Sequence, residues 1–134
     1  MGKYSQIETD IFSIFDSVEW KALSLNTYPS NFIAANTTRE FIRVSIIPSG
    51  SGINLKSSSG VLQAEIFIAS GAGPKRVSVL ADHLDEFLAG KSKLVAGRTT
   101  QFLGSSLSLI GTDPKNSALY KALYTIPFNH FGSM

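Results

Sequence analysis

Hydrophobic residues recur every three or four positions near the start of the chain, a spacing typical of a helix that buries one face. The residues of this apolar stripe are Ile7, Ile11, Ile14, Phe15 and Val18. Ser5 and Glu8 match a capping box at the start of the helix. Glu8, Asp10 and Asp16 are expected on the opposite, exposed face.

A second helix is predicted in the middle of the chain by the same spacing. Its stripe consists of Val77, Leu80, Ala81, Leu84, Phe87 and Leu88. Pro74 suits the first helical position, after a Ser-Gly-Ala-Gly turn. Gly90 suits a left-handed cap that closes the helix.

Residues 40–47 and 61–69 alternate with a period of two, which predicts strands. One face of each strand is fully apolar, and the other face is mixed. The apolar faces are Ile42, Val44 and Ile46 in the first strand, and Leu62, Ala64, Ile66 and Ile68 in the second. We expect the two strands to pair as an antiparallel hairpin.

The remaining strand predictions are residues 20–25, 94–103, 105–110 and 119–128. Tyr28 and Pro29 interrupt the chain after the first of these, and Gly97 is expected to form a bulge in the second. Leu107 and Leu109 are expected to point inward. A turn is expected over residues 111–116.

The last strand should place Tyr120, Ala122, Tyr124, Ile126 and Phe128 on one side. Pro127 cannot donate to a ladder, so we expect that end at a sheet edge. Two amphipathic helices over a mostly antiparallel, mixed sheet predict an α+β fold. The length of 134 residues favours a single domain over residues 1–131, with residues 132–134 as an added tail.

Between the hairpin strands lies a Ser/Gly-rich segment, Pro48-Ser-Gly-Ser-Gly-Ile-Asn-Leu-Lys-Ser-Ser-Ser-Gly60. A long uncharged loop between two apolar strands indicates a scaffold that displays the loop at its tip. Long loops in a compact domain are usually functional or disordered.

Charged residues make up only 16% of the chain, and the net charge is +2. The low charge leaves a neutral surface, which suits either contact with other proteins or a hydrated Ser/Thr/Asn-rich exterior. The chain has no basic run typical of nucleic-acid binding and no apolar run long enough to span a membrane. The absence of cysteine excludes disulfides and thiolate metal sites and fits a reducing compartment.

Catalytic signatures are hard to find. Gly90-Lys91-Ser92 resembles the end of a phosphate-binding loop, but it follows a helix rather than preceding one. Asp82 and Glu86, four residues apart on the second helix, could share a metal ion, although a solvated helix face is the simpler interpretation. We therefore assign no catalytic, cofactor-binding or metal-binding residue.

The chain nevertheless resembles the tail terminator proteins of long-tailed bacteriophages. The matching segments are Phe41–Pro48, Gly60–Ile68, Gly71–Pro74, Leu80–Leu84 and the closing strand from Tyr120 to Phe128. The resemblance covers residues 4–128, and its motifs are structural rather than catalytic. An N-terminal helix, strands, a glycine-rich turn and an Ala-Asp helix follow in the family's general order.

The resemblance implies a non-enzymatic part of the virion, assembled in the cytoplasm of the bacterial host. Such proteins form homohexameric rings that cap the tail tube, end its polymerisation and present a surface to the head–tail connector. DNA passes through the lumen without specific binding, and no membrane or cofactor takes part. The near-neutral charge of this chain is compatible with such a lumen.

In that setting the loop residues Ser51, Ile53, Asn54, Leu55 and Lys56 become candidates for contact with the tube. Arg39, Arg43 and Glu65 become candidates for ion pairs between subunits, or equally for ordinary surface charges. Another head–tail neck or connector protein is the alternative within the same setting. A small ligand-binding or metal-binding enzyme domain that uses Asp82 and Glu86 is the alternative from a different class.

Overall fold

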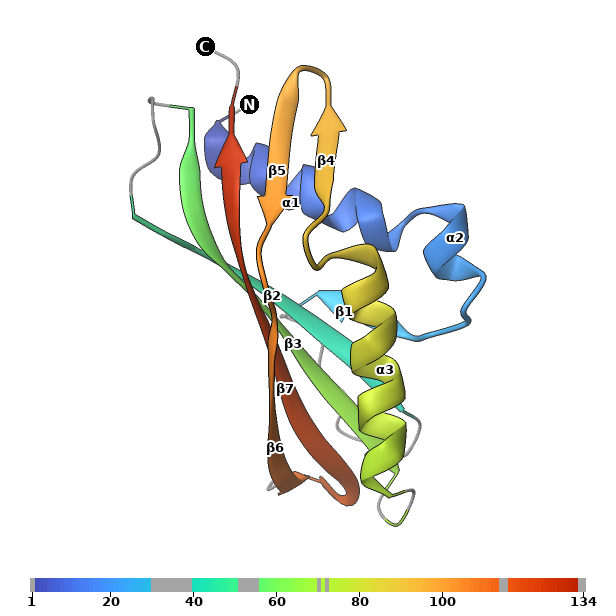
Figure 1. The fold of residues 1–134 in the computed structure, drawn as a ribbon. Helices are drawn as coiled ribbons and strands as arrows, with labels where there is room; N and C mark the ends of the chain where they lie inside the picture. The colour runs from blue at the N-terminus through green and yellow to red at the C-terminus, as the bar shows by residue number, and fades with distance from the viewer. Residues whose placement is uncertain are drawn as a thin grey trace.

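The computed structural model describes residues 2–29, 40–50, 56–69, 71, 73–113 and 116–132. These residues form an α+β fold in which helices lie on one face of a strongly twisted sheet (Figure 1). In chain order the elements are α1 (Lys3–Phe15), α2 (Val18–Lys21), β1 (Thr27–Pro29), β2 (Phe41–Ser49), β3 (Ser58–Ala69), α3 (Pro74–Phe87), β4 (Ser92–Val95), β5 (Arg98–Phe102), β6 (Ser106–Asp113) and β7 (Asn116–Phe131).

The sheet runs in the order β1-β2-β3-β7-β5-β4, and β6 pairs with β7 outside this path. β1 is parallel to β2, and the other pairs are antiparallel. β5 and β6 follow one another along the same edge of β7, so β7 is a central strand over most of its length. Figure 1 shows β7 running through the molecule toward the end where both chain termini lie.

The predicted β2–β3 hairpin is confirmed. Ile42 pairs with Ile66 and Val44 with Ala64, which places their side chains on the same face. The ladder continues as far as the pair Ser49 and Ser59, so the strands extend into the segment that was expected to be loop. Residues 51–55 lie outside the described residues.

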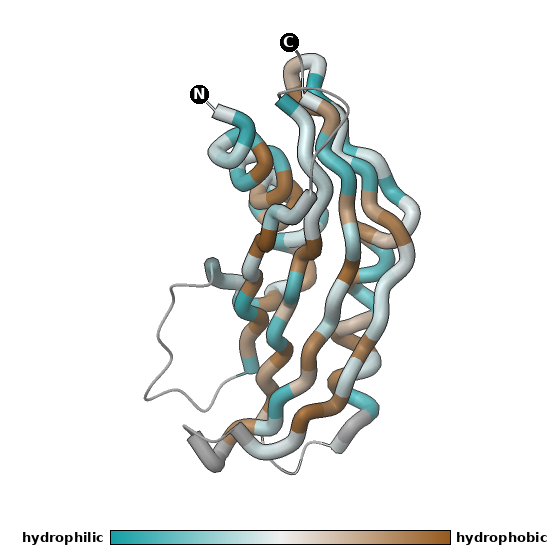
Figure 2. Tube along the Cα trace, turned by 90° about the vertical axis from the view of Figure 1, so that its left-hand side faces the viewer, coloured by the Kyte–Doolittle hydropathy of each residue, from teal (hydrophilic) through white to brown (hydrophobic). Residues whose placement is uncertain are grey.

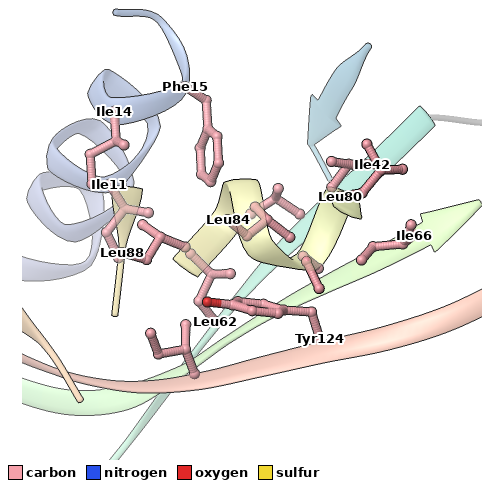
Figure 3. Close-up of a cluster of buried hydrophobic side chains, with 14 of the residues drawn as sticks. Ile11, Ile14, Phe15, Ile42, Leu62, Ile66, Leu80, Leu84, Leu88 and Tyr124 are labelled. Atoms are coloured by element: carbon pink, nitrogen blue, oxygen red, sulfur yellow. The ribbon is translucent and has the colours of Figure 1, made fainter. Parts of the chain in front are cut away.

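One face of the sheet forms the hydrophobic core with the helices. Alternate residues of the three central strands are buried there, as their pattern predicts: Ile42, Val44, Leu62, Ala64, Ile66, Ile68, Ala122, Tyr124, Ile126 and Phe128. Figure 3 shows α1 and α3 directing Ile11, Phe15, Leu84 and Leu88 onto this face. Figure 2 shows the alternation of hydrophobic and polar residues along the strands.

Three predictions for the N-terminal region are wrong. The first helix begins at Lys3 rather than after Ser5, with Gly2 as its N-cap. Val18 is 80% exposed because the chain leaves α1 after Phe15. Asp10, expected on the exposed face, is buried against the sheet.

Residues 20–25 do not form the predicted strand. Ser17 accepts a hydrogen bond from the backbone of Trp20 and caps the short helix α2 instead. The Trp20 ring contacts the rings of Phe15 and Phe87 edge-on, with centroids 5.0 and 5.1 Å apart. Its Nε1 donates to Thr27 Oγ1 at 3.0 Å, so one buried side chain joins α1, α2, α3 and β1. The expected break at residues 28–29 is the parallel strand β1.

The predicted strand over residues 94–103 is a hairpin rather than one bulged strand. β4 and β5 are joined by Ala96 and Gly97, whose φ angles are 49° and 82°. Two successive residues with positive φ are the signature of the tight turn whose twist matches that of paired strands. Gly97 therefore marks a reversal of the chain.

Pro127 lies in the central strand β7, which corrects the expectation that it marks a sheet edge. β7 pairs with β6 up to Thr125 and with β5 from Phe128 onward, so Pro127 falls in the gap between its two partners. The Pro127 carbonyl accepts from the Leu103 backbone at 3.0 Å. Because N and O of one strand residue point to the same side, the missing Pro127 N–H faces this gap, where no ladder donor is needed.

Candidate interaction surface

Most of the predicted loop contacts fall outside the described residues. Ser51, Ile53, Asn54 and Leu55 are among them, as is Arg39. Lys56 is described and lies half-buried just before β3. The base of the hairpin is closed by a hydrogen bond from Ser59 Oγ to the Ser49 carbonyl oxygen at 2.7 Å.

Arg43 and Glu65 are cross-strand neighbours on the sheet face opposite the helices. Arg43 Nε lies 2.8 Å from Glu65 Oε1, and Lys121 Nζ lies 2.6 Å from Glu65 Oε2. Burial works to raise the pKa of Glu65, but the hydrogen bonds from Arg43 and Lys121 outweigh it and hold the pKa below its ordinary value. Both cations already pair with Glu65 within one subunit. Contact between subunits through Arg43 or Glu65 therefore stays a prediction.

The two cations also cover an aromatic cluster. Arg43 and Lys121 lie 5.2 and 5.7 Å from the centroid of the Phe67 ring, which stacks on Phe41 at 4.5 Å. Phe41, Phe67 and Leu119 form a second, smaller buried cluster on this face. The sequence pattern assigned Phe41 and Phe67 to a mixed face, and it contains no signal that they would be buried.

Beside the ion-pair group, the open face of the sheet is polar but uncharged. Ser45, Gln63, Thr125 and Ser106 pair in turn across β2, β3, β7 and β6. Ser106 Oγ and Thr125 Oγ1 are 2.8 Å apart, within hydrogen-bonding distance. This row gives the open face hydrogen-bonding groups without a net charge.

The edge strand β6 exposes large apolar side chains. Leu107, Leu109 and Ile110 are 37%, 53% and 54% exposed, and Leu103 in the preceding linker is also exposed. Leu107 and Leu109 pair with the buried Tyr124 and Ala122, so they point to the helix-covered face as predicted. They remain exposed because the core formed with the helices extends over β2, β3 and β7 but does not include β6.

The outer edge of β6 also has backbone groups that can form hydrogen bonds with another strand. The Pro127 carbonyl points toward β5 and β6, so alternation along β7 directs Thr125 and Leu123 to that side as well. Their partners Ser106 and Ser108 therefore bond to β7. Leu107 and Leu109 direct their N–H and C=O groups outward, and among the described strands β6 pairs only with β7.

The other described edges carry features that discourage strand addition. β1 is three residues long and ends in Pro29. Beyond β1, the outer edge of β2 carries Pro48, which the strand's alternation places at an outward position. β4 is four residues long and contains Lys93, directly after Lys91 and Ser92. β6, eight residues long, has neither proline nor lysine.

A shallow apolar cavity of about 350 Å³ adjoins this edge. It is lined by Leu109, Tyr120, Ile68, Ala69 and the glycines at 71 and 73. The cavity lies where the chain leaves β3 and begins α3, next to the exposed side of β6. It extends the apolar surface of the edge strand.

A buried polar cluster lies between α1 and the sheet. Arg98 of β5 donates from Nε and Nη2 to the Asp10 carboxylate at 2.9 and 2.8 Å. His130 Nδ1 is 3.0 Å from Thr100 Oγ1 and 4.0 Å from Asp10 Oδ2. His130 Nε2 is buried with no hydrogen-bond partner in the described part of the chain. The burial of Asp10 could have been predicted from the sequence, because Asp10 is three residues from Ile7 and four from Ile14 and so shares their helix face.

A second polar group fixes the linker between β5 and β6. The Tyr124 hydroxyl and Ser105 Oγ each donate to Asp85 Oδ1 at 2.6 Å. Burial, together with the hydrogen bond to Asp85, raises the pKa of the Tyr124 hydroxyl. The cluster ties α3 to the start of β6 and has a structural role.

Asp82 and Glu86 are both exposed on α3. Within the described ranges, no three His, Asp or Glu side chains gather in a group that could hold a metal ion. None of the described helices has the length and apolarity needed to cross a membrane.

No family model and no curated protein matches the sequence. A solved structure that bears no functional name matches the fold with a TM-score of 0.63 and 13% sequence identity. The match covers 98% of this chain and 94% of the other. At that identity the likeness establishes a shared fold.

Proposed function

We propose that this chain is a structural subunit of a phage tail. Its copies assemble into a ring on the end of the tail tube, and the family resemblance implies six copies. In this role it stops tube growth and offers a surface to the head–tail connector, and no chemical reaction is involved. The observation that carries the proposal is the exposed edge of β6, which has neither proline nor lysine. A long edge strand that exposes apolar side chains, and whose one charged residue is Asp113 at its end, is a liability unless another chain covers it.

The asymmetry of the sheet supports this role. Proline or lysine accompanies the other described edges, whereas β6 exposes Leu107, Leu109 and Ile110. A ring requires a surface that contacts a different surface on the next copy, and then closes. The exposed β6 edge would be one of the two different surfaces that such an interface requires.

The Ser/Gly-rich loop supplies a second contact in this proposal. The paired strands β2 and β3 hold the two ends of this segment together as far as the pair Ser49 and Ser59. Ile53 and Leu55 are its apolar residues, and they would bind the tube end. Ordering a Ser/Gly-rich segment costs about 1 kcal/mol or more per residue, so binding by several copies in a ring favours stable capping.

The proposal is tested by electron microscopy of the purified protein mixed with phage tail tubes. We expect rings at tube ends, and we expect Leu109→Lys to abolish them because a lysine ammonium cannot be buried in the interface. Leu94→Lys is the matched control, since Leu94 is 70% exposed on the short β4 edge. Both substitutions should change the free energy of unfolding by less than about 0.5 kcal/mol.

Tubes that bind neither the wild type nor the control would refute the terminator role. Binding to isolated head connectors, with tubes left bare, would instead assign the chain to another position in the neck.

A further inference from the structure

The outward backbone groups of Leu107 and Leu109 restrict what can occupy the β6 edge. They offer donors and acceptors at the spacing of an antiparallel ladder, so the complementary occupant is an extended strand. No charged residue occurs between Arg98 and Asp113. This stretch offers no complementary charge to a charged partner, so an uncharged strand that brings apolar side chains to the exposed leucines suits the edge.

A second copy of this chain has such a strand in its own β6. In antiparallel pairing about a two-fold axis at Ser108, Leu107 of each copy lies opposite Leu109 of the other. Both residues direct their backbone groups outward, so each such pair exchanges both N–H···O=C bonds. Directly opposed side chains share a face, so the four leucines form one apolar cluster. The absence of charge removes any like-charge repulsion from this self-pairing.

We propose that in the free protein the β6 edges of two copies pair with each other in this register. The proposal rests on the assignment of the same edge to ring assembly, and it adds a regulatory consequence. A subunit whose β6 is paired in the two-fold dimer cannot use that edge in a ring. The dimer thus holds subunits back from assembly until a tube end displaces one copy.

The size of the contact makes the dimer reversible. About a two-fold axis at Ser108, residues 106–110 of one β6 lie opposite residues 106–110 of the other, and residues 111–113 extend beyond the paired segment. Five residues at about 3.4 Å per residue, over a sheet thickness of about 10 Å, give a strip of roughly 170 Å² in projection. Stable interfaces bury about 800 Å² on each partner, so this contact is far smaller. At the end of β5, before the linker to β6, the Phe102 N–H already donates to the Lys91 carbonyl. This bond limits any extension of the pairing between copies toward β5 and β4. We expect dimers at high micromolar concentration and monomers on dilution.

Cysteine cross-linking tests the register, because the native chain has no cysteine. In the proposed pair the two Ser108 Cα atoms face each other in a non-hydrogen-bonded position, about 4.5 Å apart, which is within the range of a disulfide. Ser106 is also exposed, and its pairing places it on the same face of β6 as Ser108. The two Ser106 Cα atoms would be about 14 Å apart, four residues along the strand, which is too far.

We expect Ser108→Cys to form a disulfide-linked dimer under mild oxidation at least tenfold faster than Ser106→Cys. Sedimentation of the wild type should show a concentration-dependent dimer that Leu109→Lys removes and Leu94→Lys retains. Equal cross-linking rates, faster cross-linking through Ser106→Cys, or a wild type that stays monomeric at high concentration would overturn the pairing.

The two proposals fail in different ways. Capped tubes without Ser108→Cys cross-linking would refute the dimer and leave the terminator role. Rapid cross-linking by a protein that never binds tubes or connectors would support the dimer and refute the terminator role.

Discussion

Asp10 determines how α1 meets the sheet. Its carboxylate is 1% exposed and receives two hydrogen bonds from Arg98, which anchors the helix to β5. His130 adds a second titratable group beside this ion pair. A buried imidazole with one unpartnered nitrogen is tolerated while neutral, because protonation would place a second cation next to Arg98 with one carboxylate between them.

We expect the stability of the protein to depend on the protonation of His130. Burial lowers the pKa of His130 below its ordinary 6.5, with Asp10 opposing this shift and Arg98 adding to it. The unfolded chain therefore binds the proton more tightly, so the free energy of unfolding falls as the pH drops below about 6.5 and through the folded pKa. Denaturant titrations at pH values from about 7.5 down to about 5 measure how the free energy of unfolding depends on pH.

His130→Asn, which keeps a polar atom near the position of Nδ1, should flatten the dependence over that range. His83→Asn is the control, because it removes the other histidine and leaves the cluster intact. An equally steep loss of stability in His130→Asn would show that other groups cause it.

Among the elements, the β4–β5 hairpin depends on two residues with positive φ. Gly97 adopts its angle of 82° readily, whereas Ala96 at 49° carries a side chain in the left-handed region. Ala96 is exposed, so the energetic cost of its positive φ comes from the backbone conformation and not from contact with neighbouring residues. Asparagine tolerates this region better, and Asn-Gly is a preferred pair for such turns.

Ala96→Asn should therefore raise the free energy of unfolding by about 0.5–1 kcal/mol, as measured by chemical denaturation. Gly97→Ala is the matched opposite change. A Cβ at that position would meet no neighbour, so it should lower stability by about 1–2 kcal/mol through backbone strain alone. If both variants were neutral, the turn would not be under conformational strain.

The elements also show where sequence patterns succeed. β2, β3 and β7 could be predicted because each has neighbours on both sides and one face in the core, so alternation and burial coincide. Trp20 was assigned to a strand because the local pattern is short, and contacts with Phe15 and Phe87, distant in sequence, decide its burial. Leu107 and Leu109 follow their alternation, but the pattern cannot show that the helix layer ends before their strand. Asp10 pairs with a residue on β5, which only the tertiary structure brings near.

At the scale of the whole molecule, the open face of the sheet, opposite the helices, holds its basic groups Arg43 and Lys121 in ion pairs. The open face is mostly neutral, and its cations Arg43 and Lys121 both pair with Glu65. Proteins that bind duplex DNA neutralise several phosphates with uncompensated Lys and Arg. A surface on which basic groups are already paired would let DNA slide past without retention.

We expect no retardation of duplex DNA by the wild-type protein at physiological salt and micromolar concentration. Glu65→Gln removes the carboxylate between the two cations, so it should give weak binding that disappears as salt increases. Electrophoretic mobility shifts at two salt concentrations measure both. Tight, salt-sensitive binding by the wild type would contradict a neutral lumen.

The single strand β7 also governs how the molecule bears tension. It is sixteen residues long, and its residues 119–130 pair with β3 on one side, while β6 and then β5 pair with it on the other. Antiparallel hydrogen bonds lie perpendicular to the strands, so a pull along β7 stretches many of them at once, whereas a sideways pull opens them one after another. A subunit mounted with β7 along the direction of force would withstand far more pulling than one mounted across it.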